Sequence, residues 1–360
     1  MKKFFIILGN GFTIDFLDHY NKYLSFKNKE PVAIDVRNLF RYGETIGVPW
    51  NKKPGFLSYK NCPALWTLGA RPNQTIKESN ELIEEIISCA NMFFDFINDP
   101  VQKNKRLNLL SESKIYLRAY SELIVYLRQL FAWYDSLISE KELNDFINNY
   151  SNWGWLSFFK NIKFAEWDKI VFVTYNYDVW LERILKSLNI NYNVYKFNRK
   201  TSAKIDIIKP HGSISFIPKK YVEQYTINYN INVEGTSIND FKLTYDNLTN
   251  YSIGAIIPPA GDSSRLKRMS SWSSILRKKA LELADSISND KDNIVIMCGI
   301  SYWHVDRREI DELLINLNPE VDFIFINPSP PRDLNAVLIS IFKNYILQTS
   351  SKNIGGIVND

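Results

Sequence analysis

Short apolar runs of four or five residues, rich in Phe, Ile and Val, recur along the chain. They are too brief for helices, and they are apolar at nearly every position instead of alternating with polar residues. This pattern is typical of strands that are buried on both faces of a parallel sheet. The runs that we interpret as strands are 4–8, 170–173, 205–208, 294–297 and 323–326.

Helical patterns follow several of these runs, at 13–20, 179–188, 305–317 and 333–345. Repetition of a strand followed by a helix implies a parallel sheet with helices on both faces. The predicted fold class is therefore α/β, a Rossmann-like parallel sheet with an inserted helical module.

The segment between the first two strands has a different pattern. Residues 27–74 hold five prolines and show no sustained period, which indicates a long irregular excursion. Thr75 and Glu78 then form a capping-box pattern, and two apolar stripes follow at helical spacing. The first stripe is Leu82, Ile86, Cys89, Phe93 and Phe96, and the second is Tyr116, Tyr120, Leu123, Leu127, Leu130 and Tyr134.

We interpret both stripes as core packing, and residues 75–160 as a helical module inserted beside the sheet. The module either mediates assembly or only covers one face of the sheet. The predicted organisation is a core of residues 1–26 and 166–350, an irregular loop plus helical insertion at 27–165, and a tail at 351–360.

Composition excludes several classes of protein. Hydrophobic residues make up 45% and aromatic residues 14% of the 360 residues, which argues against disorder. A net charge of +5 without a basic run does not indicate nucleic-acid binding. The apolar N-terminus lacks a small-residue cleavage site, so a buried strand explains it better than a signal peptide, and no run reaches the ~18 residues of a membrane span.

The three cysteines, Cys62, Cys89 and Cys298, lie far apart. They have neither the spacing of a zinc site nor that of a disulfide framework, so we expect no metal and a reducing, cytoplasmic compartment.

Ligands of an open parallel sheet bind beyond the carboxyl ends of its strands. The segments that follow the predicted strands are therefore the first candidates for a site. They are Gly9–Thr13, Thr174–Asp178, Lys209–Ser213, Gly299–Ser301 and Asn327–Pro328.

The first of these segments holds two glycines. Gly9 and Gly11 allow a tight turn and a close backbone approach, and the helix that follows presents its amides to an anion such as a pyrophosphate. The third glycine of a dinucleotide fingerprint is absent, because position 14 is Ile14. A plain strand-to-helix turn therefore explains this motif equally well when it is taken alone.

Two polar side chains in the other segments are candidates for chemistry. His211 stands between Pro210 and Gly212, on a turn that lets its ring face a cleft, with a solvent-facing turn residue as the alternative. Asn176 is a candidate helix cap, but Asp178 is better placed for that role, which leaves the amide of Asn176 for another one. We interpret His19 as structural and His304 as a loop residue near the site.

Taken together and in this order, the motifs resemble the SIR2-like family, which contains sirtuin deacylases and bacterial NAD hydrolases of antiphage defence. The matching pieces are LGNGFTIDF at 8–16, VTYNYD at 173–178, KPHGS at 209–213, IIPPA at 256–260, CGISYWHVD at 298–306 and FINP at 325–328.

The resemblance implies a role for each matched residue. Asn176 would be the catalytic Asn, with Tyr177 and Asp178 beside the nicotinamide, and His211 would be the catalytic base. The residues implied in binding the rest of NAD are Gly9, Asn10, Gly11, Phe12, Thr13 and Asp15 for the pyrophosphate and ribose, and Gly299, Ser301 and Asn327 for the adenosine half. Phe12, Tyr177 and Trp303 would shield the site or serve in packing.

The chain departs from the sirtuin pattern in two ways. It lacks the paired cysteines of the sirtuin zinc ribbon, and Asn10 replaces the alanine of the sirtuin glycine loop. The GNGF form also resembles an AbiH-like abortive-infection family. Residues 27–165 match no motif, so the similarity covers about half of the chain.

The function implied by the resemblance is hydrolysis of NAD to nicotinamide and ADP-ribose, without a metal, in antiphage defence by abortive infection. The alternatives are a non-catalytic nucleotide-sensing subunit and an NAD-dependent protein deacylase. Expected partners are further copies of the chain or a separate sensor or activator protein from the same operon, with neither nucleic acid nor membrane.

Overall fold

A parallel sheet forms the centre of this computed structural model, which describes residues 2–47, 54–98, 115–198, 200–220, 236–258, 271–287, 293–304 and 306–356. Within these ranges the sheet has seven strands in the order β3-β4-β2-β1-β7-β8-β9. Every neighbouring pair is parallel. The strands are β1 (Lys3–Leu8), β2 (Lys169–Thr174), β3 (Tyr192–Val194), β4 (Ile205–Ile208), β7 (Ile294–Cys298), β8 (Asp322–Ile326) and β9 (Asn344–Gln348).

All five predicted strands are present, because each apolar run is buried between two layers of helices. Two strands at the edges of the sheet, β3 and β9, were not predicted. The helix predicted for 333–345 is wrong at its end, since α10 (Arg332–Ile341) ends before Asn344, where the chain pairs with β8. Pairing with the neighbouring strand outweighs a helical pattern that is only local.

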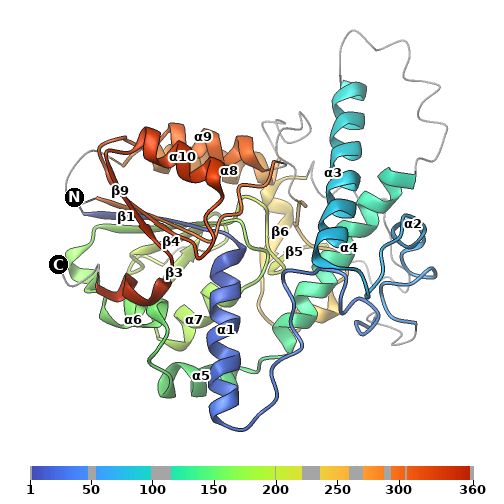
Figure 1. Cartoon of the computed structure of the whole chain (residues 1–360), viewed down its shortest axis with the longest axis horizontal. Coiled ribbons are helices and arrows are strands. Elements are labelled where there is room, and N and C mark those ends of the chain that lie inside the picture. The colour runs from blue at the N-terminus through green and yellow to red at the C-terminus, as the bar shows by residue number, and fades with distance from the viewer. Residues whose placement is uncertain are drawn as a thin grey trace.

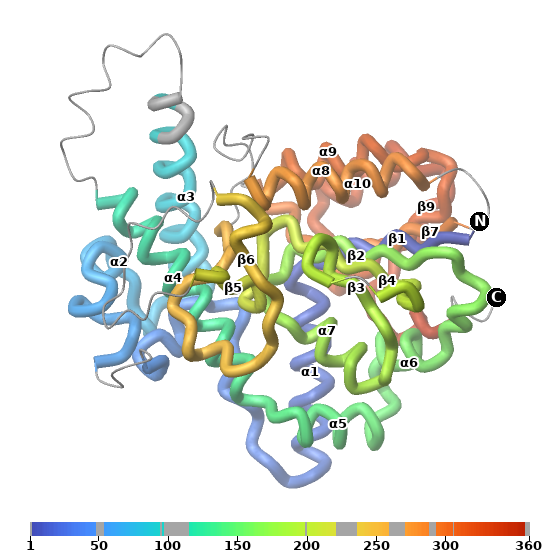
Figure 2. The backbone as a smooth tube through the Cα atoms, turned by 180° about the vertical axis from the view of Figure 1, so that it is seen from behind, coloured from blue at the N-terminus to red at the C-terminus, as the bar shows by residue number. Residues whose placement is uncertain are grey.

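Helices cover both faces of the sheet, as predicted (Figure 1). One face carries α1 (Asn10–Phe26), α5 (Glu140–Asn149), α6 (Gly154–Asn161) and α7 (Trp180–Ser187), and the other carries α8 (Trp272–Asp285), α9 (Arg307–Ile315) and α10. The view from behind shows the same two layers (Figure 2). The structure is thus a Rossmann-like α/β fold.

The inserted residues contribute to two places. The helices α2 (Pro63–Thr67), α3 (Ile76–Asn98) and α4 (Ile115–Ser136) stand beyond the carboxyl ends of the strands, whereas α5 and α6 cover the sheet (Figure 1). The predicted capping box is present, since the Glu78 amide donates to Thr75 Oγ1 at 3.2 Å and the Thr75 amide to Glu78 Oε2 at 2.8 Å. The second stripe joins the same hydrophobic core as the sheet, which confirms it as core packing. In the first stripe only Leu82 and Ile86 do so, whereas Cys89, Phe93 and Phe96 are half-buried.

The remaining elements are short. A small antiparallel pair is formed by β5 (Phe216–Pro218) and β6 (Phe241–Leu243), and 3₁₀ helices lie at Phe164–Glu166, Ile238–Asp240, Leu248–Asn250 and Ser351–Gly356. The last of these occupies part of the predicted tail and packs on α6. No helix in the described part of the chain is long and apolar enough to cross a membrane.

A close backbone contact joins the first turn of α1 to the end of β7. The Gly11 amide donates to Gly299 O at 3.0 Å, and the Gly9 amide donates to Cys298 O at 2.9 Å. A Cβ atom on Gly11 would lie 2.3 Å from the Cα of Gly299, and Gly299 itself has a φ of +65°. Because both partners in this contact are backbone, a side chain at either position could not be relieved by a rotamer change.

We predict that Gly11→Ala lowers the free energy of unfolding by about 1–3 kcal/mol, because the added methyl group overpacks this contact. The matched control is Gly356→Ala, where a Cβ meets nothing within 4 Å and the expected change is below about 0.5 kcal/mol. Denaturant unfolding of both variants measures the difference. Equal stability of Gly11→Ala and the parent protein would contradict the contact.

Candidate functional site

The five candidate segments lie along one edge of the sheet, as predicted. Because all strands are parallel, the segments that follow β4, β2, β1, β7 and β8 stand side by side in that order. From β1 the chain continues into α1 on one face, and from β7 it continues into α9 on the other (Figure 1). The change of face between β1 and β7 is the switch point at which open α/β sheets bind ligands.

The glycine segment is already helical, since α1 begins at Asn10 instead of at Thr13. Its first amides are partly used, because Gly11 donates to Gly299 O and Phe12 donates to Gly9 O. The Asn10 amide has no acceptor among the described residues and remains available to an anion. The Asn10 side chain donates to Val36 O at 2.9 Å and so holds the excursion at 27–74.

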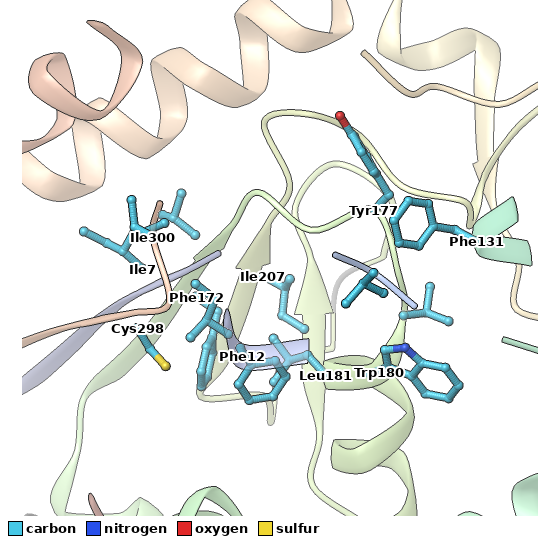
Figure 3. Close-up of a cluster of buried hydrophobic side chains, with 14 of the residues drawn as sticks. Ile7, Phe12, Phe131, Phe172, Tyr177, Trp180, Leu181, Ile207, Cys298 and Ile300 are labelled. Carbon is cyan, nitrogen blue, oxygen red and sulfur yellow. The ribbon is translucent and has the colours of Figure 1, made fainter. Parts of the chain in front are cut away.

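Two predicted site residues of α1 have their side chains elsewhere. The Phe12 ring is buried in the hydrophobic core (Figure 3). It packs edge-on against Trp155 at 5.3 Å. Asp15 Oδ2 accepts hydrogen bonds from Trp153 Nε1 at 2.8 Å and Ser351 Oγ at 2.7 Å. The structure therefore does not bring the side chains of Phe12 and Asp15 to the other predicted residues, and Phe12 does not shield the site.

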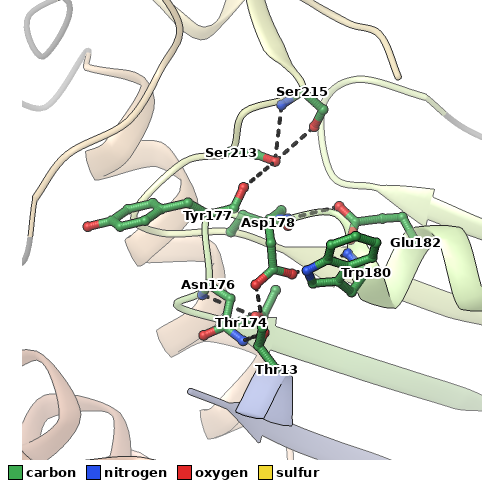
Figure 4. Close-up of polar contacts among 10 residues, drawn as sticks. Thr13, Thr174, Asn176, Tyr177, Asp178, Trp180, Glu182, Ser213 and Ser215 are labelled. Carbon is green, nitrogen blue, oxygen red and sulfur yellow. Dashed lines mark hydrogen bonds and ion pairs between the residues drawn. The ribbon is translucent and has the colours of Figure 1, made fainter. Parts of the chain in front are cut away.

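A buried hydrogen-bond network connects α1 to the segment after β2 (Figure 4). Asn176 Nδ2 donates to Gly9 O at 2.9 Å and to Thr13 Oγ1 at 3.1 Å, and Thr13 Oγ1 donates to Asp178 Oδ2 at 2.6 Å. The carbonyl of Gly9 can only accept, so the amide nitrogen of Asn176 must face it. The prediction that the Asn176 amide is free holds for its oxygen, which has no partner among the described residues, but is wrong for its nitrogen.

Asp178 combines two structural roles. Its Oδ1 accepts from the Trp180 amide at 3.2 Å, at the first residue of α7, but the N-cap position is Val179, so the prediction of Asp178 as the cap is wrong by one residue. Burial raises the pKa of this carboxyl to about 6, although Lys209 and the Thr13 hydroxyl oppose the shift. Lys209 Nζ donates to the carbonyl of Asp178 and forms a fully buried ion pair with Glu182 at 2.9 Å.

His211 is held by a turn that requires glycine. Gly212 has a φ of +83°, and a Cβ there would lie 1.8 Å from Ala255 O. The Ile257 amide donates to His211 O at 3.0 Å, so the KPHGS segment lies against Ala255 and the first two residues of the IIPPA motif, whose Pro259 and Ala260 lie outside the described residues. The side chain of His211 is only 2% exposed, and the alternative of a solvent-facing turn residue is therefore wrong.

The imidazole of His211 belongs to a cluster of buried charged groups. Its Nε2 lies 2.9 Å from Glu309 Oε2 and 3.9 Å from Asp306 Oδ1, and Arg277 NH2 lies 2.6 Å from the same oxygen of Glu309. Burial raises the pKa of Asp306 to about 6, against the opposing charge of His211. Burial would also raise the pKa of Glu309, but Arg277 and His211 outweigh it, and the pKa of Glu309 is lowered.

Sequence reasoning missed Arg277 and Glu309. Glu309 lies in the first turn of α9, where an acidic residue ordinarily complements the helix dipole, and Arg277 is one of several basic residues on α8. Nothing local distinguishes either residue from a solvated charge. Asp306, in contrast, belongs to the matched motif at 298–306.

The segment between β2 and α7 presents alternate side chains to opposite sides. The rings of Tyr175 and Tyr177 lie 5.0 and 6.5 Å from the imidazole of His211, whereas Asn176 faces Gly9 and Thr13. Tyr177 donates to Ile257 O at 2.8 Å and packs against Phe131 of α4 (Figure 3). The structure thus brings the Asn176 and His211 segments together.

The segments after β7 and β8 are held by other contacts. Asn327 Nδ2 donates to Ile300 O at 3.1 Å, and its Oδ1 accepts from the Ser329 amide, while Ser301 is exposed at the edge. Trp303 Nε1 and His304 Nε2 lie 3.1 and 3.0 Å from the two carboxylate oxygens of Glu84, so α3 holds this loop.

His19, predicted to be structural, contacts Tyr150 Oη at 3.0 Å, away from the edge of the sheet. The three cysteines all lie in the described ranges and form no disulfide there, and these ranges contain no cluster of His, Cys, Asp and Glu that could hold a metal ion. Comparison of the sequence with protein-family models and with curated proteins gives no match.

The raised pKa of Asp178 predicts a pH-dependent stability. Between about pH 4 and about pH 6 the folded state keeps this proton and the unfolded state has released it, so the parent protein loses stability as the pH rises. The variant Asp178→Asn cannot titrate there. Between about pH 4 and pH 7 the unfolding free energy of the parent should therefore fall, relative to that of the variant, by on the order of 2 kcal/mol. Denaturant unfolding at several pH values measures it, and parallel curves would contradict the prediction.

Proposed function

We propose that the protein is an NAD hydrolase that cleaves the bond between nicotinamide and ribose and gives nicotinamide and ADP-ribose. The observation that carries this proposal is the arrangement around Tyr175–Tyr177. This one segment places Asn176 against the glycine turn and two tyrosine rings against His211, next to the switch point of the sheet.

The polar atoms without partners at this edge fit the ribose of NAD. Asn176 Oδ1 has no partner among the described residues, and Asp306 Oδ1 is buried without one. The buried Asp306 oxygen needs a hydrogen-bond donor, and the Asn176 oxygen is able to accept from one; ribose hydroxyls supply such donors. The Asn10 amide, at the positive end of α1, suits a phosphate oxygen.

The reaction requires little chemistry from the protein, because nicotinamide is bound as a charged pyridinium and leaves as a neutral ring. The electron pair of the C1′–N bond goes to the nicotinamide nitrogen, and the sugar becomes cation-like. Asn176 Oδ1 orients a ribose hydroxyl or the attacking water. As the oxygen of water bonds to C1′, His211 accepts its proton, a role that typically contributes ~10² to 10⁴-fold in rate.

A non-catalytic nucleotide-binding subunit is the second candidate, because one observation fits it as well as it fits an enzyme. The Asn176 nitrogen and His211 Nε2 both have partners within the chain, which would suit a rigid binding module as well as an enzyme. No comparable observation supports the third interpretation of the sequence, a protein deacylase.

The proposed role is NAD depletion in antiphage defence by abortive infection. An enzyme that consumed NAD without control would harm its own cell, so its activity must depend on assembly or on a partner protein. Glu84 of α3 holds Trp303 and His304 beside the site, and Phe131 of α4 packs on Tyr177. The helices α3 and α4 are therefore the part of the insertion through which a partner, or a further copy of the chain, would act on the site.

We predict that Asn176→Ala and His211→Ala each lower the rate of nicotinamide release by ~10² to 10⁴-fold while the variants stay folded and bind NAD. Most binding contacts are expected from other residues, which is why affinity should persist. His19→Ala, which removes a histidine that contacts Tyr150 directly after α5, is the control and should keep the parental rate. Nicotinamide assays measure the rate, NAD titration the affinity and thermal melts the folding. Folded variants that release nicotinamide at near-parental rates would exclude the mechanism.

We also predict that hydrolysis persists in excess chelator, because every step above uses side chains and water alone. The measurement is nicotinamide release before and after dialysis against EDTA, with elemental analysis of the same sample. About one zinc per chain together with loss of activity would overturn it.

A further inference from the structure

Glu309 is a buried carboxylate for which the mechanism above has no use. It lies in the first turn of α9, and its side chain is 8% exposed. A charge in such a position is costly unless it is paired. Its partners come from two other segments, Arg277 of α8 and His211 of the turn after β4.

Glu309 is held in its ionised form. The Arg277 guanidinium lies 2.6 Å from Glu309 Oε2, and the combined effect of Arg277 and His211 lowers the pKa of the carboxyl despite burial. An ionised carboxylate accepts hydrogen bonds and cannot donate one. The nitrogen of His211 that faces Glu309 must therefore carry a hydrogen.

The orientation of the imidazole follows from this contact. With the hydrogen on Nε2, the lone pair of the neutral ring resides on Nδ1, which has no partner among the described residues. The ring of Tyr175 packs edge-on against the imidazole at 5.0 Å, and Tyr177 lies on it at 6.5 Å. A 180° flip of the ring about Cβ–Cγ would put Cε1 in the place of Nε2 and so break the contact with Glu309.

We propose that Glu309, itself held by Arg277, is a positioning residue that fixes His211 with the hydrogen on Nε2, so that Nδ1 is the atom that accepts the proton. This inference rests on the proposed function for its chemical consequence, but the tautomer can be observed without any substrate. When Nδ1 takes the proton from water, the imidazolium donates from Nε2 to Glu309, which stabilises its positive charge.

The first experiment observes the tautomer directly. Long-range ¹H–¹⁵N spectra of the full chain at about pH 8 distinguish hydrogen on Nδ1 from hydrogen on Nε2, and the chain has only three histidines. The signals of His211 are those absent from His211→Ala. We expect the Nε2–H form in the parent protein and a mixture of tautomers in Glu309→Leu. An Nδ1–H form in the parent would overturn the proposal.

The second experiment separates positioning from stability. In Glu309→Gln we expect the kcat for nicotinamide release to fall by about 10² to 10⁴-fold with KM changed less than about 3-fold, because the loss arises after binding. Glu309→Asp keeps the negative charge and should recover part of the rate. The control Glu312→Gln, at a half-exposed glutamate of the same helix, should retain the parental kcat.

The outcomes distinguish the two proposals. If the parent protein releases nicotinamide but folded Glu309→Gln keeps the parental kcat, Glu309 is structural only and the positioning role fails. If the parent releases no nicotinamide with any partner, the proposed function fails. The positioning role is then still tested by the tautomer of His211 in the parent and in Glu309→Leu.

Discussion

The contact between three glycines holds the two halves of the sheet edge together. Gly9 is the N-cap of α1 and Gly11 lies in its first turn on one face, and Gly299 directly follows β7 before the chain continues to the other face. With a Cβ of Gly11 only 2.3 Å from the Cα of Gly299, the two turns touch through backbone atoms. The glycines therefore fill the switch point themselves, and any ligand must bind above this contact instead of between the turns.

Charged groups buried around this edge impose the next constraint. Lys209 pairs with Glu182 and binds the carbonyl of Asp178, while Arg277 pairs with Glu309. Removing one partner of such a pair leaves a buried charge unpaired, which costs free energy. These contacts therefore hold the turns after β2 and β4 in one arrangement. Rigid turns of this kind preserve a site geometry more reliably than flexible loops.

Much of the fold could be predicted from the sequence, because a strand that is buried on both faces is apolar at every position. The runs at 4–8 and 323–326 show this directly. The edge strand β9 does not, since its residues are partly exposed and resemble the end of a helix. Strand order could not be predicted either, because it depends on which strands pair across long separations, such as β1 with both β2 and β7.

The candidate site was predictable only where turn chemistry marks the residue. Asn176 and His211 stand out because each follows an apolar strand, whereas Phe12 and Asp15 share the helix face that packs on α6, which no motif reveals. Glu309 reaches His211 from a separation of 98 residues. In both Asn176 and His211 one nitrogen is held by the fold and the other polar atom has no partner among the described residues. Each of these side chains can therefore serve structure and chemistry at once, because the hydrogen bond of the held nitrogen orients the other polar atom towards a ligand.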